Sequence, residues 1–495
     1  MTAAAPPRRR ATAGLHLSLG AVPPALRPAV RAFLFGYTSA VGPRILTLLV
    51  KYCNSRRRSA GAGGPDGEKK REQIAASLKK ALASGFGWNR FPAFCAALAG
   101  GSTLLEIPVR RLLQKLLGSS LGALTLTRLS RWLATFFAAA LSLQLLQSRQ
   151  MPAYTETVPA NPDQPPGGET KTIRYGGRTM DLTLFAVARA LDVIVRELWT
   201  SRRTRLVAAN KWTKADEVIS NLADPTVFSI TSAIVMWSWF YYPLNLPKTY
   251  RKWISSAAAV DERLIDALRL CKFRKLRYGE DTGVADVLGS MSVDLGLPYE
   301  WGDPEKAIPF PCEIVHTGCG PSCEYHALSR FLRSFVWSMA TYLPINLALQ
   351  LRNPSAKGLK RALLSAIRSS TFLGTFIALF YYGVCLTRTR IGPKFLGTDI
   401  PARNAIDGGL CVATGCALCG WSILLEVPQR RPELALFVAP RALAPFFPRR
   451  YPVGEQWKEI VAFAFSAATV FCAAAEDKTK VRGVLGKLLA KVMQK

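Results

Sequence analysis

Acidic residues and histidines are scarce in this chain. Its 495 residues include 33 Asp and Glu against 65 Lys and Arg, and only three histidines. A formal net charge of +32 would suit a soluble nucleic-acid binder. Such a protein would not carry long uncharged apolar runs, however, and the sequence has no arginine–aromatic stripe or finger spacing. We therefore expect no nucleic-acid partner, and interpret the basic surplus as membrane flanks that face anionic lipid.

Catalytic motifs are absent as well. There is no nucleophile elbow, P-loop, Rossmann glycine pattern or HExxH. An acyltransferase would place an acid in a short motif with its histidine, whereas His316 is followed by Thr-Gly-Cys-Gly. The eleven cysteines follow no regular framework, which argues against a disulfide-stapled secreted protein. The sequence thus predicts a protein that is not an enzyme, with no catalytic residue and no cofactor.

Long apolar runs are what the sequence does contain. Hydrophobic residues make up 49% of the chain, and its mean hydropathy is +0.14. A membrane-spanning helix needs about 20 mostly apolar residues. The candidate runs are residues 32–50, 91–105, 132–148, 225–247, 334–351, 369–387, 408–425 and 460–475. They predict an all-α polytopic membrane protein with about eight spans. Several runs are short, which favours a thin organelle bilayer.

Two distant stretches of the chain are nearly identical. Ala97 to Arg111 reads ALAGGSTLLEIPVRR and Ala417 to Arg431 reads ALCGWSILLEVPQRR, with ten of fifteen positions the same. The similarity returns in LKKALAS at 78–84 and LKRALLS at 359–365, at a different offset. These matches predict two unequal internal repeats. Small residues four apart in each copy predict close helix packing, because lipid supplies no hydrophobic drive between helices.

Each copy also carries a Glu followed by a pair of Arg. The residues are Glu106, Arg110 and Arg111 in the first copy and Glu426, Arg430 and Arg431 in the second. One interpretation pairs each Glu with the Arg four residues on, where Pro108 or Pro428 bends or ends the helix. The other turns the carboxylate inward to meet a substrate, a proton or a partner.

A charged stripe lies in residues 178–196. Asp181, Arg189, Asp192 and Arg196 fall on one helical face of an otherwise apolar segment. The segment is either an amphipathic helix in the membrane interface or a span with a polar interior face. If it does not span, the two repeats are inverted, which favours a transporter. In that alternative Glu106, Glu426, Asp181, Arg189 and Asp192 would line a polar path.

Cysteine and histidine gather at Pro311 to His326, which reads PCEIVHTGCGPSCEYH. Cys312, His316, Cys319 and Cys323 would form one helical stripe, but Gly318, Gly320 and Pro321 forbid a continuous helix. A loop could still gather four soft ligands around zinc. No CxxC pair is present in this segment. These four are therefore weak metal candidates, beside the alternative of a structural loop that caps the 334–351 run.

The same segment carries a family resemblance. The pattern C-E-I-x-H-T-x-x-x-P-S-C, in which Cys312, His316, Pro321, Ser322 and Cys323 match, resembles the N-terminal cysteine-rich region of the transmembrane protein 135 family. The resemblance continues through LEVPQRRPELALFVAPRALAPFF, which ends at Phe447, and covers about residues 311–475. Cys319 is not part of the family pattern. The resemblance implies a multi-pass protein of peroxisomal or mitochondrial membranes, linked to lipid handling and organelle dynamics. That family is distantly similar to the mitochondrial inner-membrane translocase and small peroxisomal membrane protein superfamily.

These observations predict an order along the chain. It comprises a basic flexible tail at 1–29, a first membrane repeat at 30–198, a polar middle region at 199–310 with a span at 225–247, the Cys/His loop at 311–326, a second membrane repeat at 327–475 and a basic tail at 476–495. We expect a non-enzymatic protein of an organelle membrane, peroxisomal first and mitochondrial second, that affects lipid or metabolite handling or organelle dynamics. The alternative is a transporter or channel between the repeats. The expected partners are the lipid bilayer and other membrane proteins or a second copy, bound through small-residue helix faces.

Overall fold

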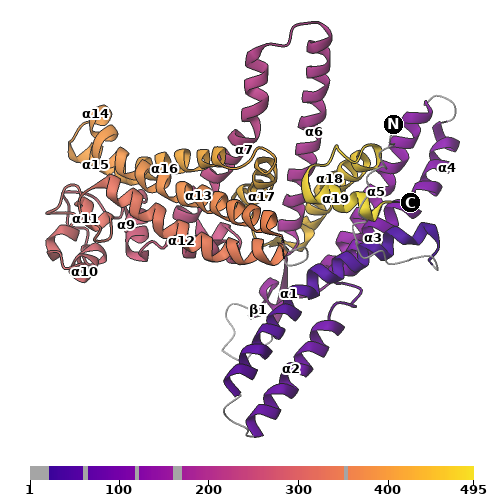
Figure 1. Cartoon of the computed structure of the whole chain (residues 1–495), viewed down its shortest axis with the longest axis horizontal. Helices are drawn as coiled ribbons and strands as arrows, with labels where there is room; N and C mark the ends of the chain where they lie inside the picture. Colours follow the sequence, from indigo (N-terminus) through magenta and orange to yellow (C-terminus); the bar gives the residue numbers. More distant parts are fainter. Residues whose placement is uncertain (1–21, 60–64, 118–121, 160–169, 351–354, 495) are drawn as a thin grey trace, which may run out of the picture. The chain divides into compact units, whose positions relative to one another are not determined.

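The computed structural model describes residues 22–59, 65–117, 122–159, 170–350 and 355–494 (Figure 1). Within them the chain is mainly helical, and three short strands form one sheet. The predicted all-α class is therefore confirmed. Two compact units divide the chain: residues 1–155 with 457–495, and residues 156–456. Of the predicted N-terminal tail, residues 1–21 lie outside the described part.

Seven helical segments of the described residues are long and apolar enough to cross a membrane. They are Pro24–Cys53, Phe91–Leu117, Ala123–Gln147, Lys214–Tyr241, Ala356–Leu396, Ile400–Leu425 and Val453–Glu476. Each overlaps one predicted run, so the protein is an integral membrane protein. Residues 334–350 of the eighth run, 334–351, fall in α12 (Cys323–Gln350), which is not among the seven. Residue 351 lies outside the described part. The Ser, Thr, Asn and Gln side chains of this run lower its mean hydropathy.

The ambiguous charged segment forms most of α6 (Met180–Ala208). This helix is long enough to cross a membrane, but it is not among the seven. Further charges follow the predicted stripe, including Arg202 and Arg205 near its end. On composition α6 therefore resembles an interfacial helix more than a span.

The first unit is built around α3. Its helices are α1 (Arg27–Ser59), α2 (Pro65–Ala83), α3 (Phe91–Leu104), α4 (Glu106–Leu117), α5 (Ala123–Gln147), α18 (Gln456–Glu476) and α19 (Gly483–Val492). Helix α3 packs against both α1 and α5. A Cβ atom on Gly100 would lie 2.7 Å from Ala29, and one on Gly101 would lie 2.9 Å from Ala138. The small residues of the first repeat copy thus allow the close helix approach that membrane packing favours.

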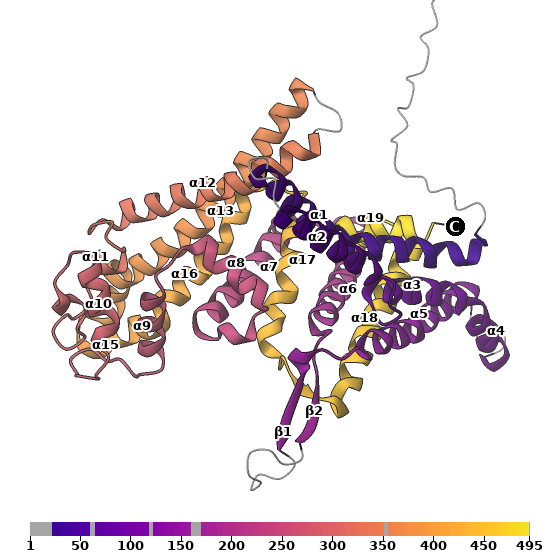
Figure 2. The same ribbon diagram turned by 90° about the horizontal axis from the view of Figure 1, so that it is seen from below.

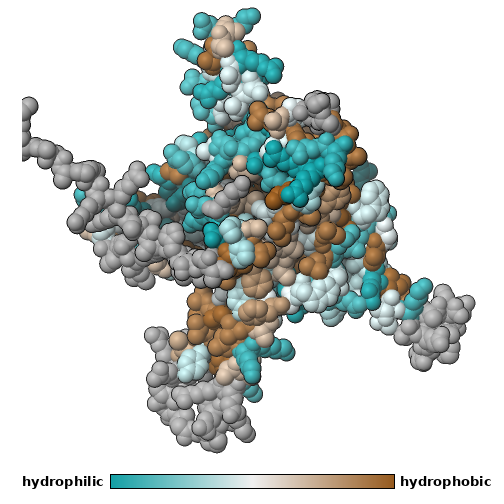
Figure 3. All heavy atoms as spheres, turned by 90° about the vertical axis from the view of Figure 1, so that its right-hand side faces the viewer, coloured by the Kyte–Doolittle hydropathy of each residue, from teal (hydrophilic) through white to brown (hydrophobic). Residues whose placement is uncertain are grey.

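Apolar side chains remain on the surface of this unit. Leu124 on α5 is 80% exposed, and Phe137 and Leu141 on the same helix are also exposed. Figure 3 shows apolar and polar side chains sharing one face of the molecule. A soluble protein rarely leaves contiguous apolar surface of this kind uncovered, whereas lipid tails cover it in a membrane.

The second unit carries the main core. The sheet has the order β1 (Thr155–Pro159), β2 (Thr170–Gly176) and β3 (Tyr451–Pro452), and β2 pairs antiparallel with β3. Helices α7 (Lys214–Tyr241), α13 (Ala356–Leu386), α16 (Cys411–Cys419) and α17 (Arg431–Leu443) surround a core rich in aromatic rings. Phe240 and Phe380 stack there with ring centroids 5.2 Å apart. Helix α12 runs beside α13, as Figure 2 shows.

A smaller core lies within the polar middle region. The helices are α8 (Lys248–Ala258), α9 (Glu262–Lys272), α10 (Asp286–Asp294) and α11 (Cys312–Val315). Leu276, Tyr278, Leu288, Met291 and Ile314 are nearly inaccessible within it. Two short helices, α14 (Gly392–Leu396) and α15 (Ile400–Ala405), connect α13 to α16. They are flanked by π-helical turns at Thr387–Ile391 and Ile406–Leu410.

Candidate functional site

The Cys/His segment folds into a compact cluster between α11 and α12. Cys312 begins α11, His316 follows its last residue, and Cys323 begins α12. The helix break that the glycines and Pro321 predict is confirmed. Thr317, Gly318 and Gly320 have φ angles of 54°, 79° and 82°, and these left-handed turns reverse the chain. As a result, one ligand atom from each of Cys312, His316 and Cys323 lies within 4.8 Å of the others.

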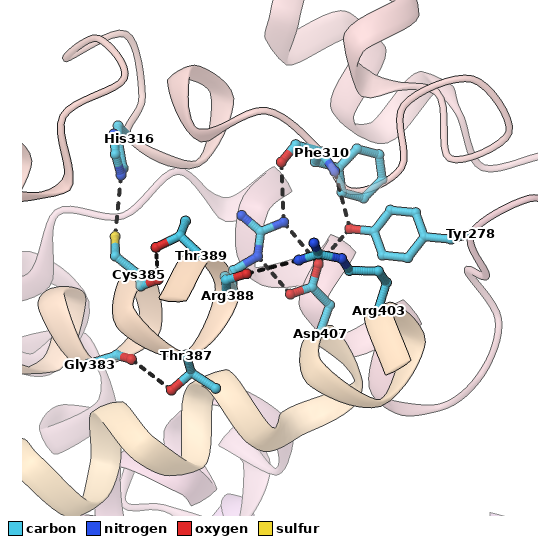
Figure 4. A network of polar contacts seen from close by, with 10 residues as sticks. All are labelled: Tyr278, Phe310, His316, Gly383, Cys385, Thr387, Arg388, Thr389, Arg403 and Asp407. Atoms are coloured by element: carbon cyan, nitrogen blue, oxygen red, sulfur yellow. Dashed lines mark hydrogen bonds and ion pairs between the residues drawn. The ribbon is translucent and has the colours of Figure 1, made fainter. Parts of the chain in front are cut away.

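His316 is the centre of this cluster. Its side chain is fully buried, and Nδ1 lies 2.7 Å from the carbonyl oxygen of Gly320. Because a carbonyl only accepts hydrogen bonds, Nδ1 carries the proton of the neutral ring. Nε2 is then an acceptor, and it faces Cys385 Sγ at 3.3 Å (Figure 4). Burial lowers the pKa of His316, which keeps the ring neutral, and burial raises the pKa of the Cys312 thiol.

His326 lies against this cluster from the first turn of α12. Its ring stacks on His316 with centroids 4.4 Å apart, and it meets the edge of Tyr381. The side chain is fully buried, and neither ring nitrogen has a hydrogen-bond partner among the described residues. Burial, with the neighbouring His316, lowers the pKa of His326 to about 3. A small cavity of about 40 Å³ touches His326 and Cys385, which is room for a water molecule.

The other predicted residues of the segment lie outside the cluster. Cys319 Sγ is 3.9 Å from Ser329 Oγ. Pro321 and Ser322 are exposed, and Ser322 Oγ accepts a hydrogen bond from the Tyr325 N–H at the start of α12. Three of the four weak metal candidates thus come together, and Cys385 lies where the sequence suggested Cys319. Sequence reasoning missed Cys385 because it sits inside an apolar run, where a cysteine is interpreted as a small hydrophobe.

A buried ion pair lies close to the cluster. Arg388 Nε donates to Asp407 Oδ1 at 2.7 Å, and Arg388 Nη2 donates to Oδ2 at 2.9 Å (Figure 4). The Tyr278 hydroxyl donates to Oδ2 at 2.5 Å, and Arg388 Nη2 also reaches the Phe310 carbonyl. Both charged side chains are about 5% exposed. Burial and the Asp407 charge raise the pKa of Tyr278 well above its usual range. The network ties the middle region to the ends of α13 and α16.

Arg388 and Asp407 each lie beside an apolar run of the sequence. Arg388 directly follows the 369–387 run, and Asp407 directly precedes the 408–425 run. Such charges serve as the boundaries of apolar runs, where they are expected to reach water. Here two adjacent boundaries carry opposite charge, and each lies in a π-helical turn. π-Helical turns are frequent at functional sites.

The repeated Glu residues have different surroundings. Glu106 accepts a hydrogen bond from Arg131 Nε at 2.8 Å, and both side chains are partly exposed. Glu426 is 3% exposed and accepts from the Ser369 hydroxyl at 2.7 Å, while Arg430 Nη1 lies 3.6 Å away. The predicted pairing with the Arg four residues on is therefore present at Glu426, and Glu106 uses Arg131 of α5 instead.

The arginine pairs that follow the two Glu residues also have different surroundings. Arg110 and Arg111 are exposed. Arg430 donates to the Ser365 hydroxyl at 2.9 Å. Arg431 donates to the backbone carbonyls of Glu426 and Leu424 at 3.0 and 2.8 Å. In the second copy, Arg431 thus binds the end of its own helix, where carbonyls lack helical partners, and Arg430 binds α13.

Of the predicted polar path, Glu106 belongs to the first unit, and Glu426, Asp181, Arg189 and Asp192 belong to the second. Asp181 pairs with Arg449 at 2.6 Å and is largely exposed. The Arg189 guanidinium lies over the Phe185 ring, 5.2 Å from its centroid, and Asp192 is half-buried. None of the five predicted path residues lines the 40 Å³ cavity beside His326 or the 460 Å³ cavity walled by α7, α8, α12, α13 and α17.

A larger cavity of about 460 Å³ lies in the second unit. Its walls come from α7, α8, α12, α13 and α17. They include Phe228, Val235, Met236, Trp253, Ile254, Phe372, Phe376, Ile377, Leu434, Phe437 and Val438. The polar atoms at the cavity come from Ser232, Thr249, Tyr250, Tyr342 and Arg441. The Arg441 guanidinium lies 4.9 Å from the Tyr250 ring centroid and 3.8 Å from that of Phe437.

No family model, curated protein or solved structure matches the chain.

Proposed function

We propose that this protein is a non-enzymatic organelle membrane protein that binds a lipid acyl chain in the 460 Å³ cavity and thereby takes part in lipid handling. The volume of this cavity is the observation that carries the proposal, because it falls within the range of about 300–1,000 Å³ that small-molecule sites occupy. Its walls are mostly aliphatic and aromatic, which suits a hydrocarbon chain.

The position of the cavity supports a ligand drawn from the bilayer. Two of its walls, α7 and α13, belong to segments long and apolar enough to span a membrane. Helix α8 forms another wall, buries Ile254 and Ala257, and exposes Lys248 and Lys252. A short helix with one apolar and one basic face is typical of the membrane interface. An acyl chain can therefore enter from lipid while its headgroup stays near basic side chains.

Arg441 is the residue we assign to the headgroup. Its guanidinium is held over two aromatic rings at the cavity, and its Nη1 donates to the Phe437 carbonyl. These contacts order the side chain, and its other N–H groups can bind an anion. A fatty-acid carboxylate or a lipid phosphate would supply that anion. Arg441→Gln should weaken the binding of an anionic lipid by about fivefold, since one basic residue contributes about 1 kcal/mol to anionic lipid attraction.

The cavity assignment is tested by photocrosslinking. A diazirine-bearing fatty acid is added to the purified full-length protein in detergent, and labelled peptides are identified. Ile377 is 6% exposed and lines the cavity, so Ile377→Trp should fill it and abolish labelling of its walls. Ile230 on α7 is 56% exposed, and Ile230→Trp is the matched control that should label as wild type does. Equal labelling of both variants would contradict the proposal, as would labelling confined to outer helix faces.

We also propose that the protein belongs to the transmembrane protein 135 family and resides in the peroxisomal membrane. The motif that contains Cys312, His316 and Cys323 supports this family, and the shortness of several uncharged runs in the sequence supports a thin organelle bilayer. Tagged protein should colocalise with a peroxisomal marker. Colocalisation with a mitochondrial marker would favour the second assignment, and a plasma-membrane signal would contradict both.

A further inference from the structure

The Cys/His cluster has a fourth soft ligand that comes from a distant part of the chain. Cys385 lies in the last turn of α13, and its sulfur is 3.3 Å from His316 Nε2. It also interacts with the thiol of Cys323 and, electrostatically, with Cys312. We propose that Cys312, His316, Cys323 and Cys385 bind one zinc ion in a closed tetrahedral site. This proposal is independent of the lipid-binding cavity.

The ligand spacing suits zinc. Zn–S bonds of about 2.3 Å and Zn–N bonds of about 2.0 Å place tetrahedral ligand atoms about 3.5 to 3.8 Å apart. Nε2 of His316 and Sγ of Cys385 are 3.3 Å apart, and the ligand atoms of Cys312, His316 and Cys323 lie within 4.8 Å of one another. These separations differ from tetrahedral spacing by roughly 1 Å at most.

The orientation of His316 is already that of a metal ligand. Metal-binding histidines commonly donate their second ring N–H to a carbonyl or carboxylate, which fixes the tautomer and the plane of the ring. Gly320 provides that carbonyl at 2.7 Å from Nδ1, and its φ of 82° turns the loop so that the carbonyl faces the ring. Nε2 is thereby left as the coordinating atom.

The donor set selects the metal. Three thiolates and one imidazole are soft ligands that favour zinc over the oxygen-seeking ions calcium and magnesium. Coordination converts three thiols into thiolates, so binding one Zn²⁺ releases three protons and leaves the site with one net negative charge. The buried Arg330 donates to the hydroxyl of Thr317 in the same loop.

The lack of a hydrogen-bond partner for the His326 ring among the described residues distinguishes this site from an ordinary hydrophobic core. Buried ring nitrogens nearly always find a hydrogen-bond partner. His326 has none among the described residues, and its ring covers one side of His316. We assign it to shielding the metal site rather than to coordination, because Cys385 already reaches His316 Nε2. The zinc would join α11, α12 and the end of α13, beside the Arg388–Asp407 pair.

The first test uses the wild-type full-length protein in detergent. Elemental analysis should find about one zinc per chain, and X-ray absorption at the zinc edge should show three sulfur ligands and one nitrogen. Two sulfurs and two nitrogens would overturn the role of Cys385 in favour of His326. Absence of bound zinc after purification and after incubation with zinc chloride would overturn the site itself. Neither measurement depends on a variant that might fail to fold.

The second test compares Cys385 with Cys319, a cysteine of the Cys/His loop that lies outside the cluster. Cys385→Ser should reduce the zinc content from about one per chain to near zero. Cys319→Ser should retain it, because Cys319 contacts Ser329 instead of the cluster. Cys416→Ser, which changes another buried cysteine of an apolar run, controls for general damage to the helices. Retention of zinc by Cys385→Ser, or its loss from all three variants alike, would contradict the assignment.

Discussion

The two copies of the repeated element show how one sequence pattern serves two environments. In the first copy, α3 ends at Leu104, and α4 begins at Glu106, whose carboxylate is partly exposed. In the second copy, α16 tightens into a 3₁₀ turn at Gly420–Leu425, and Glu426 is almost fully buried. The pattern Glu-x-Pro-x-Arg-Arg therefore fixes a break in the helix, while the neighbouring helices decide whether the carboxylate reaches solvent.

The neighbours explain the difference. Ser369 on α13 presents its hydroxyl to Glu426, and Arg430 donates to Ser365 of the same helix. Arg431 donates to the Leu424 carbonyl in the 3₁₀ turn that precedes Glu426. Glu106 instead meets a long arginine side chain, Arg131, at a partly exposed position. A buried carboxylate is tolerated only with such hydrogen bonds, because the desolvation of an unpaired charge is costly. The second copy is thus the more constrained of the two.

The largest expected effect comes from a charge that lies just before the second copy. Asp407 precedes α16, and the residue at the same distance before the first copy is Gly87. Asp407→Asn leaves Arg388 buried with one charge unpaired, which should cost about 3–5 kcal/mol in the free energy of unfolding. Chemical denaturation in detergent measures this loss. Glu476→Gln removes the partner of the exposed Arg128 and is the matched control, with an expected cost of about 1 kcal/mol or less.

The next effect compares the two Glu residues directly. Glu426→Ala removes a buried acceptor of the Ser369 hydroxyl and should cost about 1.5–3 kcal/mol, since hydrogen bonds to charged groups contribute that much. Glu106→Ala should cost about 1 kcal/mol or less, because its ion pair is partly exposed. Denaturation midpoints of the two variants provide the measurement. Equal losses would show that burial does not distinguish the copies.

A smaller and equal effect is expected where the copies agree. Gly100 and Gly420 occupy the same place in the repeat, and a Cβ atom would lie 2.7 Å from Ala29 Cβ at the first and 2.4 Å from Ser229 Cα at the second. Each Gly→Ala change should cost about 1 kcal/mol through overpacking. Gly122→Ala, where a Cβ meets no atom within 4 Å, is the control. A neutral effect at both repeat positions would contradict the close-packing role.

Much of the helical architecture could be predicted from the sequence. The apolar runs indicated the spanning segments because hydropathy acts locally along the chain, and the Gly and Pro residues of 311–326 indicated the break between α11 and α12. The eighth run was less apolar than its lack of charge suggested. Small residues four apart indicated tight helix contacts, which the surroundings of Gly100 and Gly420 bear out.

The rest depends on contacts between distant residues. Cys385 is 62 positions after Cys323, and Asp407 is 129 positions after Tyr278, so no local spacing links them. Their meeting requires the α12–α13 hairpin and the two π-helical turns, which hydropathy does not specify. The sequence does show that Arg388 ends one apolar run and that Asp407, of opposite charge, precedes the next run. Because the connection between the two runs is short, these two residues are expected to lie close together.

The smallest expected effect measures how strongly Glu106 and Arg131 are coupled. A double-mutant cycle with Glu106→Gln, Arg131→Gln and both together should give a coupling energy of about 0.2–1 kcal/mol, because both side chains are about 30% exposed. The coupling should shrink at 1 M salt, where screening is strong. The corresponding cycle at Glu426 and Ser369 should be insensitive to salt, since the pair is buried and one member is neutral. A coupling at Glu106 that matches the Glu426 value and resists salt would mean that a membrane or partner buries the first copy too, and the difference between the copies would then vanish.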